Sequence, residues 1–303
     1  MSFTHSFIAR TLPLVPKPIV RRVSRRYIAG ETLAEAVATV RDLNNAGLMA
    51  TLDVLGESVT ERSLVDAAVR DYGAAIEAIR GERLDANISI KPTQFGLSLD
   101  FDLCLDRVRA LVVRARDAGN FVRIDMEDSG CTSATLDLYR RLHNEGFTNV
   151  GVVLQAYMRR SLADVRALPE GANVRLCKGI YIEPVEVAYQ DRGVVNKNFV
   201  RLLEALLERG AYVGIATHDE DLVFEAERIV ERRRLQGNTY EFQMLLGVAE
   251  PLRRLVRGAG HRLRVYVPYG LQWYAYSLRR LKENPRIAGY VLSSLLQGDP
   301  ARR

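Results

Sequence analysis

The chain has 303 residues, of which 48% are hydrophobic, so it can bury a sizeable core in one large domain or two small ones. No apolar run reaches the ~18 residues that a membrane-spanning helix needs, and Cys104, Cys131 and Cys177 form neither a CxxC motif nor a zinc-ligand pattern. The formal net charge of +6 is compatible with nucleic acid, an anionic membrane or an acidic substrate, so charge alone does not identify the partner.

The first 30 residues contain several prolines and then a cluster of arginines, Arg21, Arg22, Arg25 and Arg26. We expect a solvated basic arm, with contact to a partner or an anionic membrane surface as the sharper alternative. Arg25 and Arg26 resemble a twin-arginine export signal, but no apolar run follows them, so we expect that the protein is not exported. We therefore expect the cysteines to stay reduced in the cytoplasm. Residues 31–48 are predicted to form a helix that begins near the cap residue Thr32 and ends at Gly47.

From residue 50 onward, short apolar runs rich in β-branched residues alternate with segments that have helical apolar spacing. The eight runs are Ala50–Leu55, Ile88–Lys91, Val122–Met126, Val150–Gln155, Val174–Cys177, Val213–Thr217, Glu241–Leu246 and Leu263–Val267. The helical segments between them include Leu64–Ile79, Leu103–Ala115, Phe199–Leu207 and Leu222–Val230. This alternation predicts an α/β fold, a (βα)8 barrel. An open, doubly wound sheet of seven strands is the competing arrangement, since one weak run could be miscounted.

Polar side chains gather where the predicted strands end. They include Glu57, Lys91, Asp125, Glu127, Asp128, Gln155, Arg175, Lys178, Thr217, His218, Asp219, Gln243, Tyr266 and Tyr269. In a barrel of this kind the C-terminal strand ends form the mouth, where catalytic groups lie. Because unpaired buried charge is costly, this concentration indicates an active site.

The segment after the last predicted strand places Tyr276, Arg279, Arg280 and Glu283 on one helical face. Two adjacent guanidinium groups match the geometry of a carboxylate, so this face is a candidate site for a small anion with a cationic end. A solvated surface helix is the plainer alternative.

The chemistry of the predicted mouth is not fixed by motifs alone. The four histidines are scattered, and HExxH, GxGxxG, P-loop and GxSxG patterns are missing from the sequence, so we expect no metal site. Lys91 could act as a Schiff-base lysine of a lyase or aldolase. A basic nucleic-acid-binding protein is a non-catalytic alternative, but the chain has no nucleic-acid-binding motif.

Eight motifs together resemble the proline dehydrogenase family. In order they are ISIKPT (88–93), VRIDMED (122–128), VVLQAY (152–157), VRLCKGIY (174–181), ATHDE (216–220), EFQMLLG (241–247), VYVPYG (265–270) and YSLRRLKEN (276–284). The likeness spans roughly residues 50–290, and the chain is similar in length to the short monofunctional bacterial form. Two departures are Ile180, where the family has a small residue, and a short turn between Tyr266 and Tyr276.

The resemblance implies a distorted (βα)8 TIM barrel with extra N-terminal helices. It divides the chain into an arm and helix (1–48), an FAD-binding catalytic barrel (49–298) and a tail (299–303). The implied reaction is oxidation of L-proline to Δ1-pyrroline-5-carboxylate by hydride transfer to FAD N5, the first step of proline catabolism to glutamate. A quinone would reoxidise the flavin, and a pyrroline-5-carboxylate dehydrogenase would act next. The implied location is the cytoplasm, with the basic arm as a candidate contact to the inner face of the cell membrane.

The resemblance also implies roles for individual residues. Arg279 and Arg280 would bind the proline carboxylate, while Glu57 would pair with Arg279 as a gate in the empty site. The rest of the substrate pocket would come from Lys91, Tyr181, Leu245, Tyr266, Tyr276 and Glu283. FAD would be bound by Gln155, Arg175, Lys178, Gly179, Thr217, His218 and Gln243. The catalytic residues would be Arg175 beside the flavin, Asp125 as the carboxylate that orders the cations, and Lys91.

Overall fold

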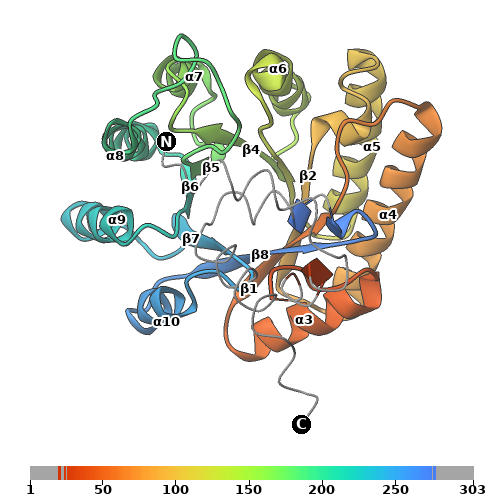
Figure 1. Ribbon diagram of the computed structural model, residues 1–303, viewed down its shortest axis with the longest axis horizontal. Coiled ribbons are helices and arrows are strands. Elements are labelled where there is room, and N and C mark those ends of the chain that lie inside the picture. The colour runs from red at the N-terminus through yellow and green to blue at the C-terminus, as the bar shows by residue number, and fades with distance from the viewer. Residues whose placement is uncertain (1–19, 22–23, 25, 275, 278–303) are drawn as a thin grey trace, which may run out of the picture.

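The computed structural model describes residues 20–21, 24, 26–274 and 276–277, and within them eight parallel strands close into a barrel (Figure 1). The strands are β1 (Met49–Val54), β2 (Ala86–Ile90), β3 (Val122–Ile124), β4 (Val150–Gln155), β5 (Asn173–Cys177), β6 (Tyr212–Ala216), β7 (Tyr240–Leu245) and β8 (Leu263–Tyr269). They are hydrogen-bonded in chain order, and β1 pairs with β8 from Met49↔Arg264 to Val54↔Tyr269. The (βα)8 prediction is therefore confirmed, and the seven-strand open sheet is wrong because every predicted run forms a strand of one closed sheet.

The helices form a ring around the barrel (Figure 1). They are α3 (Leu33–Asn45), α4 (Arg62–Gly81), α5 (Phe101–Asp117), α6 (Ser129–Asn144), α7 (Ser161–Ala167), α8 (Arg192–Glu208), α9 (Glu220–Arg233) and α10 (Glu250–Gly258). A short 3-10 helix, η2 (Pro92–Phe95), follows β2. Each segment that we predicted as helical from its apolar spacing lies within one of these helices.

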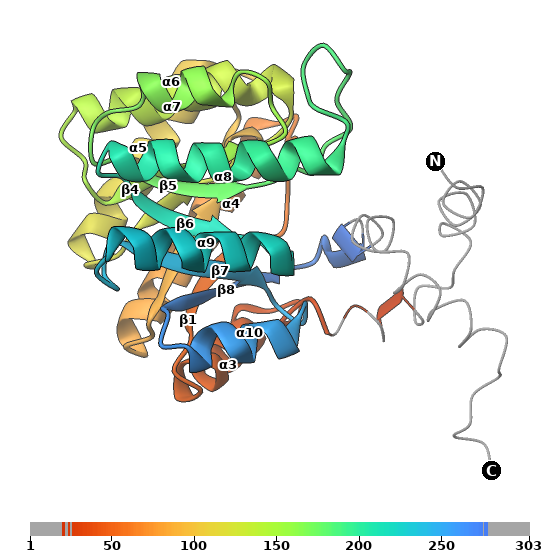
Figure 2. The same ribbon diagram turned by 90° about the vertical axis from the view of Figure 1, so that its left-hand side faces the viewer.

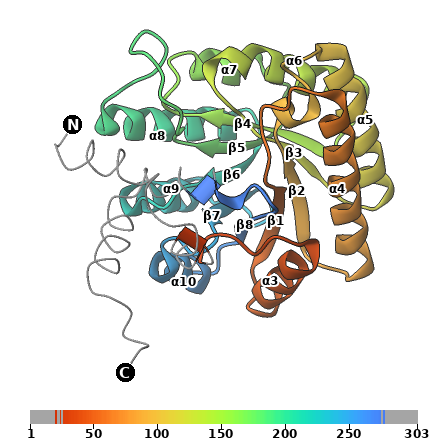
Figure 3. The ribbon, with the colours of Figure 1, turned by 45° about the vertical axis from the view of Figure 1, so that its right-hand side comes forward.

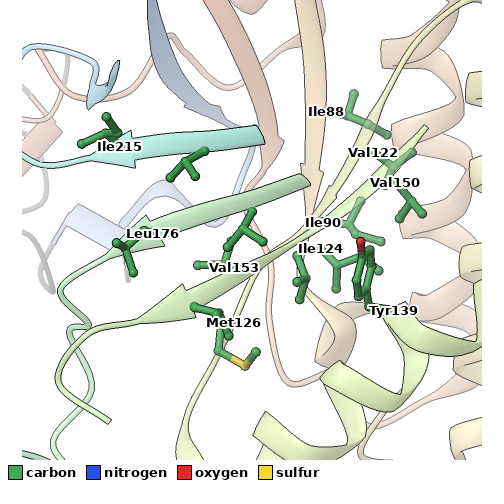
Figure 4. Packing of buried hydrophobic residues seen from close by; sticks show 14 of the residues in the cluster. Ile88, Ile90, Val122, Ile124, Met126, Tyr139, Val150, Val153, Leu176 and Ile215 are labelled. Carbon is green, nitrogen blue, oxygen red and sulfur yellow. The ribbon is translucent and has the colours of Figure 1, made fainter. Parts of the chain in front are cut away.

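The main core fills the layer between the strands and the helices. Outward-facing strand residues such as Ile88, Ile90 and Ile124 are fully buried, and Figure 4 shows Ile90 and Ile124 beside Tyr139 of α6. Helices bury one stripe each: α4, for example, buries Val65 and residues at helical spacing after it, while its other face carries charges. Burial of apolar surface in this layer stabilises the barrel and leaves its interior available for polar side chains.

Helix α3 leads into the first strand. The side chain of Thr32 accepts a hydrogen bond from the backbone of Glu35, whose carboxylate in turn accepts from the Thr32 N–H, which forms a complete capping box. The predicted helix over 31–48 is thus confirmed, with slightly shorter bounds. Helix α3 packs against both β1 and β8 and lies between α10 and α4 (Figure 3), where it covers the seam that closes the barrel.

The segments on either side of the described barrel meet over the mouth. The Ala29 N–H donates to Pro268 O at 2.9 Å, and the Gly270 N–H donates to Gly30 O at 3.0 Å. Ile28, Leu55 and Tyr276 form a small buried cluster beside Tyr27 and Trp273. Residues 273–274 and 276–277 therefore lie at the C-terminal end of the barrel (Figure 2).

Three further observations concern the predicted membrane contact, the cysteines and the C-terminal helical face. No helix within the described ranges is long and apolar enough to cross a membrane. The three cysteines are free, and Cys104 is buried. Most of the basic arm, and the face that carries Arg279, Arg280 and Glu283, lie outside the described residues.

Candidate active site

A cavity of about 610 Å³ occupies the mouth of the barrel. Thirteen of the predicted site residues line it: Lys91, Asp125, Gln155, Arg175, Lys178, Gly179, Tyr181, Thr217, His218, Gln243, Leu245, Tyr266 and Tyr276. Glu57 is in the loop after β1 and is not among the lining residues, whereas Arg279, Arg280 and Glu283 belong to the undescribed segment. Residues named from the strand ends and residues implied by the family resemblance thus line one cavity.

Asp125, just beyond β3, collects hydrogen bonds from three strands. Its Oδ1 accepts from Arg175 Nη1 at 2.5 Å and from Ser89 Oγ at 2.8 Å, and its Oδ2 accepts from the Tyr266 hydroxyl at 2.8 Å. Burial, reinforced by the Asp125 charge, raises the pKa of Tyr266 well above its ordinary value. The phenol therefore stays protonated at neutral pH and donates to the carboxylate.

Arg175 lines the cavity and is held by side chains of several strands. Its Nε donates to Gln243 Oε1 at 2.5 Å, Nη1 donates to Asp125 and Ser89, and the guanidinium carbon is 5.2 Å from the centre of the Tyr266 ring. Across the described part of the chain, Nη2 has no hydrogen-bond partner. This arrangement fixes the plane of a cation whose remaining donors are available to a bound anion or polar ring.

Lys91 is paired with a residue that sequence reasoning missed. Its Nζ donates to Asp53 Oδ1 at 2.6 Å, and Asp53 is 0% exposed. The Tyr72 hydroxyl also donates to Ser89 O at 2.7 Å and lies 3.2 Å from Asp53 Oδ1. Burial lowers the pKa of the Lys91 ammonium, but the carboxylates of Asp53 and Asp125 outweigh it, so the net shift is upward. The sequence feature that could have identified Asp53 as a site residue is a carboxylate in the middle of the apolar run Ala50–Leu55.

A second wall of the cavity, formed mainly by residues that follow β5 and β6, combines cations and other hydrogen-bonding groups. Lys178 Nζ is ion-paired with Asp219, which also caps α9 and was named at a strand end but not as a site residue. Arg192 lines this wall too and had not been predicted. His218 Nε2 accepts from the Leu245 N–H at 2.8 Å, so a neutral His218 carries its proton on Nδ1. Such a wall suits phosphate groups.

The cavity fits the cofactor that the sequence predicts. Gln155 is buried, and no described residue forms a hydrogen bond with its Oε1. Gly179 lines the cavity, and its φ of +101° together with the nearby Tyr157 ring, 2.2 Å from where a Cβ would lie, requires glycine at this position. Apolar wall residues, among them Met126, Val153 and Met244, offer surface to a flat ring. Together with the cationic wall, these features match a flavin that has polar ring edges and a diphosphate.

Hydrogen bonds connect the loop that carries Glu57 to Thr93 and, through Thr93, to Glu127. The Ser58 N–H donates to Thr93 Oγ1 at 2.9 Å, and Glu127 accepts from the Thr93 N–H at 2.9 Å. Burial raises the pKa of Glu127, although the bonds from Thr93 oppose the shift. Glu127 also lines the cavity. The gate that we predicted from the sequence stays a prediction, because its partner Arg279 lies beyond the described ranges.

Among the described residues no cluster of His, Cys, Asp or Glu could hold a metal ion.

Comparisons with known proteins agree with this geometry. The sequence model of the family described as Proline dehydrogenase matches residues 36–291. The chain is 37% identical to Proline dehydrogenase 1 of Bacillus subtilis (strain 168), covering 90% of this chain and 91% of that one. It is 36% identical to Proline dehydrogenase of Deinococcus radiodurans, covering 95% and 97%. Among solved structures, proline utilization A (PutA) from Bdellovibrio bacteriovorus, inactivated by N-propargylglycine, matches with a TM-score of 0.82 and 26% identity. That match covers 87% of this chain, which spans 33% of the PutA chain.

Proposed function

The chain belongs to the proline dehydrogenase family, and from this premise we propose that it oxidises L-proline to Δ1-pyrroline-5-carboxylate with FAD as its cofactor. The observation that carries the proposal is the arrangement of Arg175, Asp125 and Tyr266 in a mouth cavity that also holds the Lys91–Asp53 pair. These charged groups are fixed by one another before any ligand binds, as an oriented reaction requires.

FAD fits the cavity, and specific residues would bind it. We assign its diphosphate to the wall of Lys178, Thr217 and His218, and its ring to Gln155, Arg175, Gly179 and Gln243. When bound, the flavin supplies an acceptor for a hydride. Arg175 would then place positive charge beside the polar edge of the ring, where it stabilises negative charge.

Proline brings a carboxylate, a ring nitrogen and apolar methylenes. We assign the carboxylate to Arg279 and Arg280 on the strength of the YSLRRLKEN motif, with Glu283 on the same face and Glu57 as the gate that pairs with Arg279. The apolar ring would pack against Tyr181, Leu245, Tyr266 and Tyr276, which line the cavity. Aromatic and apolar surfaces hold the substrate carbon in one orientation and exclude water.

The alternative of a Schiff-base lyase loses support in this geometry. A Schiff base needs a neutral amine, but Lys91 donates to Asp53 and its pKa is raised. We assign Lys91 to the substrate pocket as a fixed ammonium that orders the carboxylates around it. Nucleic-acid binding was the other alternative, and no described feature adds support to it.

The reduced enzyme needs an electron acceptor, and we propose a quinone. A quinone lies in the membrane, so the basic arm over residues 1–30 is the proposed peripheral contact of a cytoplasmic protein. The imine product is in equilibrium with an aldehyde, so an aldehyde-oxidising enzyme, a pyrroline-5-carboxylate dehydrogenase, would consume it.

The test is to incubate purified, FAD-supplied protein with L-proline and a soluble quinone. We expect Δ1-pyrroline-5-carboxylate, trapped as its adduct with an aromatic amino-aldehyde, in proportion to quinone consumed. D-Proline serves as the control substrate. Borohydride treatment during turnover should leave Lys91 unmodified. Covalent labelling of Lys91 without quinone consumption would replace the proposal with the lyase reaction.

A further inference from the structure

A buried ion pair lies on the floor of the barrel, beneath the candidate site. Glu241 of β7 is 2% exposed and Arg264 of β8 is 8% exposed, and neither lines the cavity. Arg264 Nε donates to Glu241 Oε1 at 2.7 Å, and Arg264 Nη1 donates to Ala50 O at 2.8 Å. A buried ion pair adds little stability compared with apolar residues of the same size, so its presence in a barrel interior suggests a role in orientation.

Gln243 connects this floor to the site. Its Nε2 donates to Glu241 Oε1 at 2.6 Å, and its Oε1 accepts from Arg175 Nε at 2.5 Å. A carboxylate only accepts hydrogen bonds and a guanidinium only donates them. The two contacts therefore fix which end of the Gln243 amide faces Arg175.

The neighbouring strand leaves room for this connection. A Cβ on Gly214 of β6 would lie 2.4 Å from Gln243 Nε2 and 2.8 Å from its Cδ. Gly214 thus opens the slot in which the amide lies. With Nε held by Gln243 and Nη1 held by Asp125, the guanidinium of Arg175 has one plane, and its Nη2 is directed away from these partners.

We propose that Glu241 is a positioning residue for Arg175, acting through Gln243 and held in place by Arg264. The inference rests on the proposed role of Arg175 in proline oxidation. An amide at position 241 replaces one of the two accepting oxygens with a donor, which cannot accept from Arg264 and Gln243 together in every orientation. The Gln243 amide can then turn its NH₂ toward Arg175 and present a donor to a donor. The guanidinium then loses its fixed plane, and a small misplacement of a catalytic group has a large effect on rate.

The test compares Glu241→Gln with the wild type as full-length, FAD-supplied enzyme. We expect kcat to fall about 10- to 100-fold, while KM for proline changes less than about threefold, because the proposed carboxylate-binding arginines are untouched. Tyr212→Phe is the matched control. It removes the 2.8 Å hydrogen bond to Glu241 Oε2 but leaves the contacts of Glu241 with Gln243 and Arg264. Its kcat should match that of the wild type.

The exchange of both residues, Glu241→Gln with Gln243→Glu, restores an acceptor for Arg175 Nε while Arg264 still lacks its carboxylate at position 241. Because Gln243 is also assigned to the flavin ring, kcat is measured at FAD concentrations that saturate each variant. We then expect kcat to recover about tenfold over the single variant, even if the melting temperature does not. Wild-type kcat in Glu241→Gln, or no recovery in the exchanged variant at equal melting temperature, would overturn the proposal.

A readout independent of turnover separates this proposal from the proposed function. The Nε proton of Arg175, assigned by comparison with Arg175→Lys, should exchange with solvent at least about tenfold faster in Glu241→Gln than in the wild type, because its hydrogen bond is lost. An unchanged exchange rate contradicts the positioning role. A wild type that shows slow exchange but no proline oxidation would refute only the proposed function.

Discussion

The buried pair of Lys91 and Asp53 shows how much a single side chain matters in the mouth of this barrel. Asp53 is 0% exposed, and its Oδ2 has no hydrogen bond among the described residues. Its Oδ1 depends on Lys91 at 2.6 Å and on Tyr72. Removal of the ammonium would leave a buried carboxylate without its counter-charge.

We therefore expect Lys91→Met to lower the free energy of unfolding by about 3–5 kcal/mol, measured by denaturant titration. The double variant Lys91→Met with Asp53→Asn should recover much of that stability, because the buried charge is gone, yet it should remain poorly active. Equal stability of Lys91→Met and the wild type would show that the pair is not the electrostatic unit that the geometry indicates.

The contributions of Glu241 and Glu127 to the free energy of unfolding should change in opposite directions as the pH falls. The pKa of Glu241 is lowered, since Arg264 and further donors outweigh the opposing effect of burial, whereas burial raises the pKa of Glu127. The lowered pKa of Glu241 stabilises the folded protein at pH values above the ordinary pKa of 4.5, and this stabilisation is lost as the pH falls. A raised pKa contributes stability below 4.5 that is lost as pH rises through the folded-state pKa.

Unfolding free energies of the wild type, Glu241→Gln and Glu127→Gln between about pH 3.5 and 7 test these signs. The advantage of the wild type over Glu241→Gln should shrink as pH falls below 4.5. Relative to Glu127→Gln, the wild type should gain stability as pH falls from 7 toward 4.5. Parallel curves for all three proteins would contradict both assignments.

At the scale of elements, α3 closes the seam between β8 and β1. Its capping box depends on the Thr32 hydroxyl, so Thr32→Ala should lower the unfolding free energy by about 1 kcal/mol. Thr39→Ala is the matched control on the same helix: its hydroxyl only bonds back to Glu35 O. A thermal or denaturant melt that ranks the two variants equally would argue against the cap as a determinant of the seam.

The helices and strands were the part of the structure that the sequence predicted best. Alternating apolar runs and helical spacing predicted all eight strands, since each strand is buried on its outer face by a helix. The side chains inside the barrel were harder to assign. Asp53 sits within an apolar strand, and only the closed barrel shows that it faces Lys91. Glu241 and Gln243 share a face of β7, and only the closed barrel shows that Arg264 and Arg175 lie beside them. Gln243 was predicted from the family as a cofactor ligand, and its contacts add a link to Arg175 that sequence alone could not show.

At the scale of the molecule, a ring of helices and a seam helix stabilise a barrel whose interior is unusually polar. The apolar layer lies between strands and helices, so charges such as Arg175 and Glu241 can remain inside the sheet, each paired with a neighbour from another strand. The fold thereby supplies a fixed electrostatic mouth before ligands arrive.

The most direct measurement is an anaerobic visible spectrum of the purified, full-length protein before and after addition of L-proline. The account predicts a flavin absorption band that bleaches when proline is added, because proline reduces the bound cofactor. A flavin band that proline leaves unchanged would contradict the substrate. A protein that stays colourless after FAD is supplied would contradict the cofactor, and with it the proposed reaction.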